Sequence, residues 1–135
     1  MASFYCKYAP LAYNENTLPV PISVVELSLF LQQAESIWDE GERQEFVDFI
    51  ARDPEAGDVI PETGGIRKVR WRRQGKGKRG GARVIYFCRN ARMPLFLILI
   101  YAKAQRENMT VDEKKQVRGL ATVLRQSYGK KDTNR

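Results

Sequence analysis

The feature that most constrains the fold is a nearly continuous apolar run over residues 95–102, directly after the segment Arg92-Met93-Pro94. A run with almost no polar positions indicates a central β-strand that is buried on both faces. It is far shorter than the roughly 18–20 residues that a membrane span needs, and Glu26 interrupts the longest apolar stretch near the start of the chain. We therefore expect a globular protein built around this strand.

Three other segments have strand character. Residues 66–72 alternate, with Lys68 and Arg70 on one face and Val69 and Trp71 on the other. Residues 82–89 are rich in β-branched and aromatic side chains, and residues 22–26 form a further short candidate. Together with the apolar run, these segments predict a small antiparallel sheet.

Helical periods flank the predicted sheet. Apolar residues recur at helical spacing over residues 27–38, and Asp39 with Glu42 forms a capping box for a second helix that ends near Asp53-Pro54. Thr110 with Glu113 forms another capping box, which begins a C-terminal helix with an apolar stripe up to residue 128. The predicted class is α+β, with two N-terminal helices, a C-terminal helix and all helices on one face of the sheet.

The length of 135 residues suits one domain, which we place at residues 22–128. Residues 1–21 are expected to form an irregular N-terminal arm, and residues 129–135 a polar tail. The N-terminus has no secretory pattern, so we expect a cytoplasmic protein. The chain has no histidine, and its two cysteines, Cys6 and Cys88, have no metal-ligand spacing. We therefore expect neither a metal nor another cofactor.

Charge is distributed very unevenly along the chain. Residues 1–65 hold 3 basic and 12 acidic side chains, whereas residues 66–135 hold 20 basic and 4 acidic ones. Nine of the lysines and arginines fall within residues 66–83, where there is no acid. Such a local positive field indicates a polyanion as partner, with nucleic acid ahead of a membrane surface. A solvated surface that only maintains solubility is the alternative.

The glycine-rich segment within that basic region spells G-x-G-x-x-G over residues 75–80. A dinucleotide site would need a following helix and an acidic residue about 20 positions later, and neither is expected here. We interpret the glycines instead as allowing close approach to a phosphate chain. The same segment supplies positive charge from Lys76, Lys78 and Arg79. A flexible hairpin connection with incidental lysines is the alternative.

Strand alternation also predicts a basic cluster. If the strand register aligns them, four side chains converge on one face of the sheet: Lys68, Arg70, Arg83 and Lys103. Such a cluster can hold a phosphodiester and stabilise the charge that develops during its cleavage. Without histidine, a lysine whose pKa is lowered by neighbouring cations is the expected proton acceptor. Phosphate binding without chemistry is equally consistent with these residues.

The aromatic residues of the strands have two interpretations. Tyr86 and Phe87 are expected to pack in the core, and Trp71 faces away from the basic cluster. For Tyr101, packing and stacking on an RNA base are equally favoured. Cys88 is expected to be a buried, inert thiol.

Several segments together resemble the signature of HigB-type toxins in the RelE superfamily. These are GDVIP at 57–61, TGGIRKVRW at 63–71, GKGKRGGARVIY at 75–86, YAK at 101–103 and the start of the last helix at 110–115. The resemblance covers roughly residues 22–125, and Glu62 stands where glycine is usual. It implies a RelE-like fold over the predicted domain and the toxin of a type II toxin–antitoxin system.

The resemblance further implies a ribosome-dependent endoribonuclease that cleaves mRNA by attack of a 2′-hydroxyl on the adjacent phosphate, without a metal. Its implied partners are mRNA on the ribosome and a helix-turn-helix, HigA-like antitoxin. The toxin would contact operator DNA only as part of its complex with the antitoxin. The family's basic site positions fall on Lys68, Arg70, Arg83 and Lys103. Further RNA contacts are expected from Arg67, Arg72, Arg73, Lys76, Lys78, Arg79, Tyr101 and Arg106. The alternative is a non-catalytic basic module that binds RNA or the ribosome.

Overall fold

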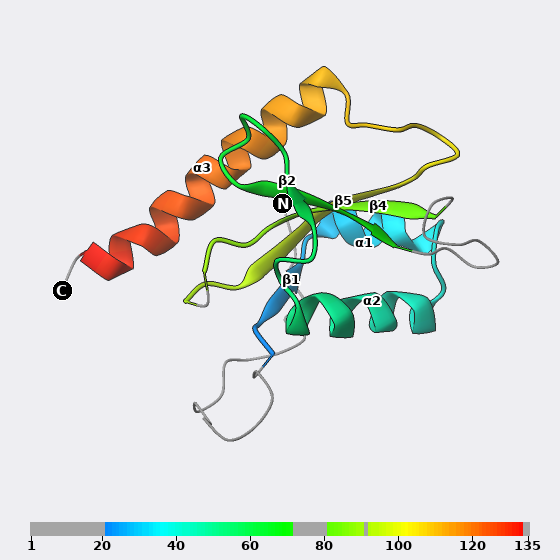
Figure 1. Cartoon of the computed structure of the whole chain (residues 1–135), viewed down its shortest axis with the longest axis horizontal. Helices are drawn as coiled ribbons and strands as arrows, with labels where there is room; N and C mark the ends of the chain where they lie inside the picture. Colours follow the sequence, from blue (N-terminus) through cyan, green and yellow to red (C-terminus); the bar gives the residue numbers. More distant parts are fainter. Residues whose placement is uncertain (1–20, 72–80, 91, 134–135) are drawn as a thin grey trace.

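A computed structural model describes residues 21–71, 81–90 and 92–133, with side chains up to residue 128. Three helices and five strands follow one another along the described chain (Figure 1). In chain order they are β1 (Val24–Glu26), α1 (Ser28–Glu35), α2 (Glu40–Arg52), β2 (Asp58–Val59), β3 (Ile66–Trp71), β4 (Ala82–Phe87), β5 (Leu95–Ala102) and α3 (Val111–Thr133). The predicted α+β class is confirmed.

The five strands form one sheet in the order β1-β5-β4-β3-β2. All eight residues of β5 are buried, which confirms the prediction made from the apolar run. The sheet is mostly antiparallel, which confirms the predicted antiparallel sheet, and its one exception is the parallel pairing of β1 with β5. The parallel pairing is possible because two helices and three strands separate β1 from β5 in the chain, which leaves ample length for a crossover connection.

The helices cover both faces of the sheet, and the prediction of helices on one face is wrong. Figure 1 shows α3 on one side of the sheet and α2 on the other. One core cluster joins α1 and α2 to side chains such as Trp71 and Tyr86. A second cluster joins α3, through Val117 and Ala121, to the opposite face. The physical reason lies in β4 and β5, whose residues are apolar on both faces and therefore need a packed layer on each side.

Both predicted capping boxes are present. Asp39 Oδ1 accepts a hydrogen bond from the Glu42 amide at 2.7 Å, and Glu42 Oε1 accepts one from the Asp39 amide at 2.9 Å. Thr110 and Glu113 make the same reciprocal pair at the start of α3, at 3.1 Å and 2.9 Å. These contacts satisfy amides that lack a partner within the helix, so each box determines where its helix begins.

The element boundaries differ from the prediction in two places. β2 is a two-residue edge strand that was not predicted, because two exposed residues give no periodic signal. α3 continues to Thr133, past the expected boundary at residue 128. The arm predicted at residues 1–21 lies outside the described residues except for its last residue, as do residues 134–135 of the predicted tail. Within the described chain, no helix is long and apolar enough to cross a membrane.

Candidate nucleic-acid interface

The predicted basic face is formed by the registers of β3, β4 and β5. Arg70 pairs with Arg83 across β3 and β4, and Arg83 pairs with Tyr101 across β4 and β5. The adjacent pair on β3 and β4 is Lys68 with Ile85, and Ile85 belongs to the core on the α3 side. Lys68, Arg70 and Arg83 are therefore brought together on the face that α3 covers, as strand alternation predicted.

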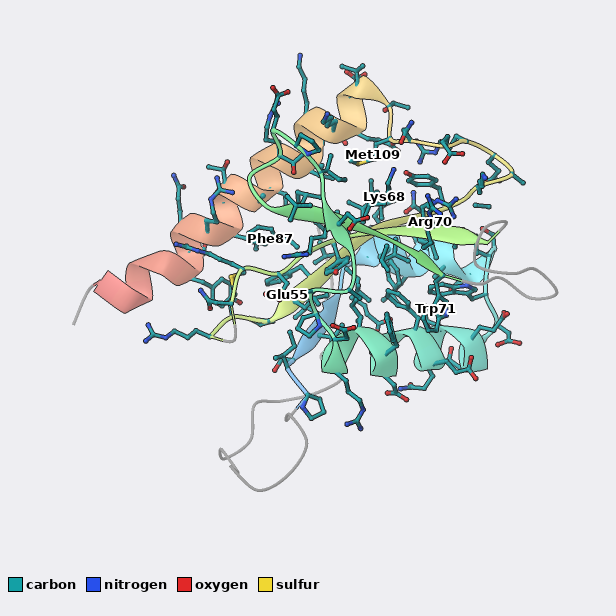
Figure 2. The ribbon with its side chains drawn as sticks, viewed as in Figure 1. Glu55, Lys68, Arg70, Trp71, Phe87 and Met109 are labelled. Carbon is teal, nitrogen blue, oxygen red and sulfur yellow. The ribbon has the colours of Figure 1, made fainter. Side chains whose placement is uncertain are left out.

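Arg70 and Arg83 differ sharply in exposure. The Arg70 side chain is exposed, whereas Arg83 is only 1% exposed and ranks among the largest fully buried side chains. Like charges directly opposite each other on neighbouring strands repel, so this pair favours an anion nearby. Figure 2 shows Lys68 and Arg70 below the loop that leads into α3, while Trp71 points toward α2 on the other side of the sheet.

Lys103 joins the cluster from just beyond the end of β5. Its backbone amide donates to the Gly81 carbonyl at 2.9 Å, which continues the strand pairing by one more residue. Its Nζ lies 4.0 Å from one carboxylate oxygen of Glu107, and Arg83 Nη2 lies 4.0 Å from the other. Arg83 and Lys103 therefore meet around the same acid, and all four predicted cationic side chains lie on one face of the sheet.

Lys68 lines a small cavity beside this cluster. The Lys68 Nζ donates a hydrogen bond to Asn108 Oδ1 at 3.0 Å. The cavity has a volume of about 140 Å³ and is lined by Ile60, Lys68, Tyr101, Asn108, Met109 and Lys114. Because it lies between β3 and the loop before α3, a group bound there would contact the strand and the loop together.

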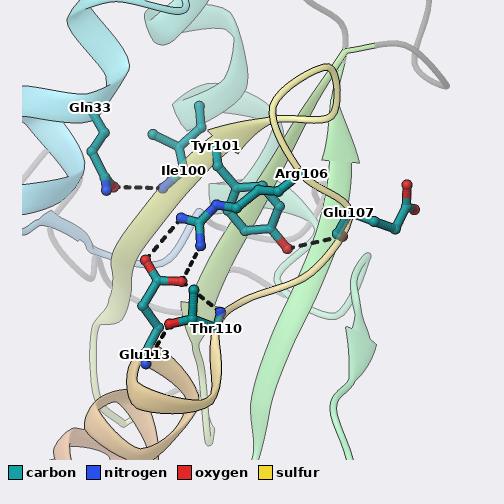
Figure 3. A network of polar contacts seen from close by, with 7 residues as sticks. All are labelled: Gln33, Ile100, Tyr101, Arg106, Glu107, Thr110 and Glu113. Carbon is teal, nitrogen blue, oxygen red and sulfur yellow. Dashed lines mark hydrogen bonds and ion pairs between the residues drawn. The ribbon is translucent and has the colours of Figure 1, made fainter.

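Tyr101 and Arg106 form a stacked pair at the edge of this site (Figure 3). The Arg106 guanidinium lies 4.4 Å from the centre of the Tyr101 ring, and both of its terminal nitrogens bind the carboxylate of Glu113. This ion pair lowers the pKa of Glu113. Tyr101 is only 3% exposed, and burial raises the pKa of its hydroxyl. In this conformation the ring packs against Arg106 and is not open to a base.

Among the remaining predicted RNA contacts, Arg67 does not join the cluster. Arg67 lies on the opposite face of β3, where its Nη1 donates to the Gly57 carbonyl at 2.6 Å. It therefore fixes the segment between α2 and β2. Five further predicted contacts lie outside the described residues: Arg72, Arg73, Lys76, Lys78 and Arg79.

The same segment is held by Tyr86. The Tyr86 hydroxyl accepts a hydrogen bond from the Gly57 amide and donates one to the Pro54 carbonyl, each at 2.8 Å. A Cβ on Gly57 would lie 2.8 Å from the Lys68 carbonyl oxygen and 2.9 Å from the Tyr86 ring, which explains the glycine. Burial raises the pKa of Tyr86 to about 12 and that of the Cys88 thiol to about 11. Both residues thus act in packing, as expected.

Two residues of the site were not predicted, Glu107 and Asn108. Both belong to the loop between β5 and α3, where the strand and helix periods give no information about side-chain direction. The available signal was that Glu107 is one of only four acids after residue 65, in a region that is otherwise strongly basic. An isolated acid among many cations is a candidate for an ion pair.

The residues of the basic face define a class of protein by their chemistry. The described residues contain no group of three or more histidine, cysteine or acidic side chains suited to hold a metal ion. The face instead presents two guanidinium groups and two ammonium groups. Guanidinium and ammonium groups bind phosphate oxygens through charge-assisted hydrogen bonds. The chain is a small α+β protein with a cationic sheet face.

A comparison with protein families then gives the particular family. The family model described as the RelE toxin of the RelE/RelB toxin–antitoxin system matches residues 52–133, which is more than half of the chain. The chain belongs to the RelE toxin family and is the toxin of a toxin–antitoxin system. The match begins at the end of α2 and includes every strand and loop that forms the basic face. Toxins of this family generally cleave mRNA, and their partner is an antitoxin.

Proposed function

We propose that this protein is a ribosome-dependent endoribonuclease that cleaves mRNA at the basic face. The single observation that supports this most strongly is the strand register, which sets Arg70 beside Arg83 on the face that also carries Lys68. Lys103 approaches the same point from the end of β5. Four cations at one place provide more local positive charge than a single phosphate contact requires, as expected where negative charge increases during a reaction.

The proposed reaction is attack of an RNA 2′-hydroxyl on the adjacent phosphorus. A bond forms between the 2′-oxygen and phosphorus, and the bond between phosphorus and the 5′-oxygen of the next nucleotide breaks. The products are a 2′,3′-cyclic phosphate and a 5′-hydroxyl. Arg70 and Arg83 would bind the non-bridging oxygens, whose charge increases in the transition state.

Proton transfer is assigned to the lysines. Lys68 and Lys103 are the two candidates for taking the proton of the 2′-hydroxyl and for supplying one to the leaving 5′-oxygen. The lysine that takes the proton must be neutral, with a free electron pair on Nζ, and the lysine that supplies the proton must be charged. No step of this reaction requires a metal ion, because cationic side chains provide the charge.

The partners follow from the same proposal. The substrate is mRNA held in the decoding site of a translating ribosome in the cytoplasm. The antitoxin is a helix-turn-helix, HigA-like protein, and operator DNA is reached only through it. Further phosphate contacts would come from the basic segment at residues 72–79, and Tyr101 would reach a base only after the loop at residues 103–110 moves.

The experiment is controlled expression, with mRNA 5′-ends mapped minutes after induction. Arg70→Ala is the sharpest variant, because Arg70 is exposed and its loss should leave the fold intact. Arg52→Ala is the matched control, since Arg52 is exposed on α2, which covers the opposite face. We expect cleavage within translated frames, abolished by Arg70→Ala and retained by Arg52→Ala.

The alternative is a basic module that binds RNA or the ribosome without cutting. It is consistent with the same four cations, because phosphate binding and catalysis use the same charges. Intact messages from a folded wild-type protein that still binds RNA would refute the nuclease and favour this module. Reduced translation without new mRNA 5′-ends would lead to the same conclusion.

A further inference from the structure

The loop at residues 103–110 places an acid at the centre of the basic face. The Glu107 carboxylate has one oxygen 4.0 Å from Arg83 Nη2 and the other 4.0 Å from Lys103 Nζ. One anionic group thus bridges a guanidinium on β4 and an ammonium at the end of β5. Two oxygens that each face one cation are also what a phosphodiester presents through its non-bridging oxygens.

Arg83 places a buried guanidinium beside this acid. Its side chain is 2% exposed, whereas that of Glu107 is 57% exposed. A guanidinium keeps its charge at all physiological pH values, and a buried charge is costly without an opposite charge nearby. Arg70, directly across the strands, adds a second positive charge. A carboxylate from the loop partly compensates this charge when no RNA is bound.

The backbone of the loop is fixed by three contacts around Glu107. Arg106 is paired with Glu113 of α3, and the Tyr101 hydroxyl donates to the Glu107 carbonyl at 3.4 Å. Lys68 binds the next residue, Asn108. In Figure 3 the Glu107 side chain points away from the Arg106–Glu113 pair. The loop therefore holds Glu107 in place while its carboxylate extends separately toward Arg83 and Lys103.

The two contacts of the carboxylate are weak. A separation of 4.0 Å is longer than a hydrogen bond, and more than half of the Glu107 side chain is exposed to solvent. Exposed ion pairs of this kind contribute little to the free energy of folding. A phosphate that approaches closely enough to form hydrogen bonds would therefore displace the carboxylate.

We propose that the Glu107 carboxylate occupies the position of an RNA phosphate between Arg83 and Lys103 and competes with RNA for this site. The proposal rests on the proposed function, since it assumes that the basic face binds RNA. Binding then includes the exchange of one anion for another, which lowers RNA affinity and makes it less sensitive to salt. Glu107 is an autoinhibitory residue, and its removal should strengthen RNA binding.

The test compares RNA affinity in Glu107→Gln and wild-type protein. The probe is a labelled single-stranded RNA with 2′-O-methyl riboses, which cannot undergo cleavage, measured by fluorescence anisotropy over a range of salt concentrations. Glu35→Gln is the control, because it removes the same charge from an exposed position on α1, on the opposite face. We expect binding to tighten about 2- to 5-fold in Glu107→Gln, the range typical of losing one exposed ion pair.

Salt dependence provides a second measurement. The slope of the logarithm of affinity against the logarithm of salt should become steeper by up to ~0.7 in Glu107→Gln, because one more phosphate contact then releases a counterion. Glu35→Gln should leave the slope unchanged. In a Lys103→Ala background, Glu107→Gln should raise the RNA affinity by a smaller factor. One of the two cations for which Glu107 and RNA compete is then absent.

Three results would overturn the proposal, and they distinguish it from the proposed function. Equal affinities for Glu107→Gln and wild type, with binding still weakened by Arg70→Ala, would reject the competition and leave the RNA site intact. An equal gain in Glu35→Gln would show that net charge alone is responsible. Absence of RNA binding by every variant would reject the competition, and intact mRNA in the expression experiment would separately reject the proposed function.

Discussion

Replacing Tyr86 with phenylalanine removes one hydroxyl from the centre of the fold and leaves the ring in place. That hydroxyl makes two hydrogen bonds of 2.8 Å, accepting from the Gly57 amide and donating to the Pro54 carbonyl. Tyr86 is 0% exposed, and the bond to Gly57 is buried as well. The variant therefore leaves a buried amide without its partner, while the carbonyl is only partly buried.

The expected loss can be estimated from these two contacts. An unsatisfied buried donor costs about 1–3 kcal/mol, and the bond to the partly buried carbonyl adds roughly 0.5–1 kcal/mol. We expect Tyr86→Phe to lower the free energy of unfolding by about 1.5–4 kcal/mol. Most domains have a stability of roughly 5–15 kcal/mol, so the loss is large enough to measure. Urea unfolding followed by the fluorescence of the buried Trp38 and Trp71 measures it directly.

Tyr101→Phe is the matched control. Its hydroxyl makes a longer bond, 3.4 Å to the Glu107 carbonyl, and this bond is partly buried. We expect its loss to cost less than about 0.5 kcal/mol. A loss below about 0.5 kcal/mol in Tyr86→Phe, with an unchanged urea dependence, would refute the reasoning, because the hydroxyl would then contribute nothing to the fold.

Three further predictions concern backbone strain and buried groups. Glu62 has a φ of 63°, a left-handed backbone conformation that glycine adopts without strain. Glu62→Gly should therefore raise the free energy of unfolding by about 0.5–1 kcal/mol. A lower free energy of unfolding in the variant, measured by urea titration, would contradict this strain. Because the pKa of Cys88 is raised to about 11 from 9.0, its alkylation by iodoacetamide at pH 8 should be roughly 100-fold slower in the native protein than in urea. Peptide mass spectrometry measures both alkylation rates, and equal rates in the native protein and in urea would contradict this burial. The pKa of Tyr86 is raised from 10.0 to about 12, so its stabilising contribution is complete below pH 10 and decreases as pH rises toward 12. Urea unfolding should show a weaker pH dependence over this range in Tyr86→Phe, and an identical dependence would refute the assignment.

Much of the sheet was predictable because its signals are local. The apolar run identified β5, and alternation in β3 separated Lys68 and Arg70 from Trp71. Paired polar residues located the start of α2 and α3. Each of these signals depends on residues within one turn or one strand, where the chain geometry alone determines the faces.

The features that were missed depend on contacts between distant segments. The apolar stripe of α3 shows that the helix packs on something, but not which face of the sheet it covers. Similarly, nothing local makes β1 parallel to β5. Arg83 was assigned to the site by strand parity, but parity gave no indication of its burial or of the acid beside it. Loop conformation has no period, so sequence reasoning identified the cations but not the acid placed among them.

The position of β5 within the chain also has a consequence for synthesis. β5 lies between β1 and β4, and it supplies residues to the cores on both faces of the sheet. When β1 and α1 emerge from the ribosome, β5, with which both of them pack, has not yet been translated, so these long-range contacts must form late. The basic face also needs the end of β5. A nascent chain therefore has no complete basic face until residues 95–103 have left the ribosome that makes it.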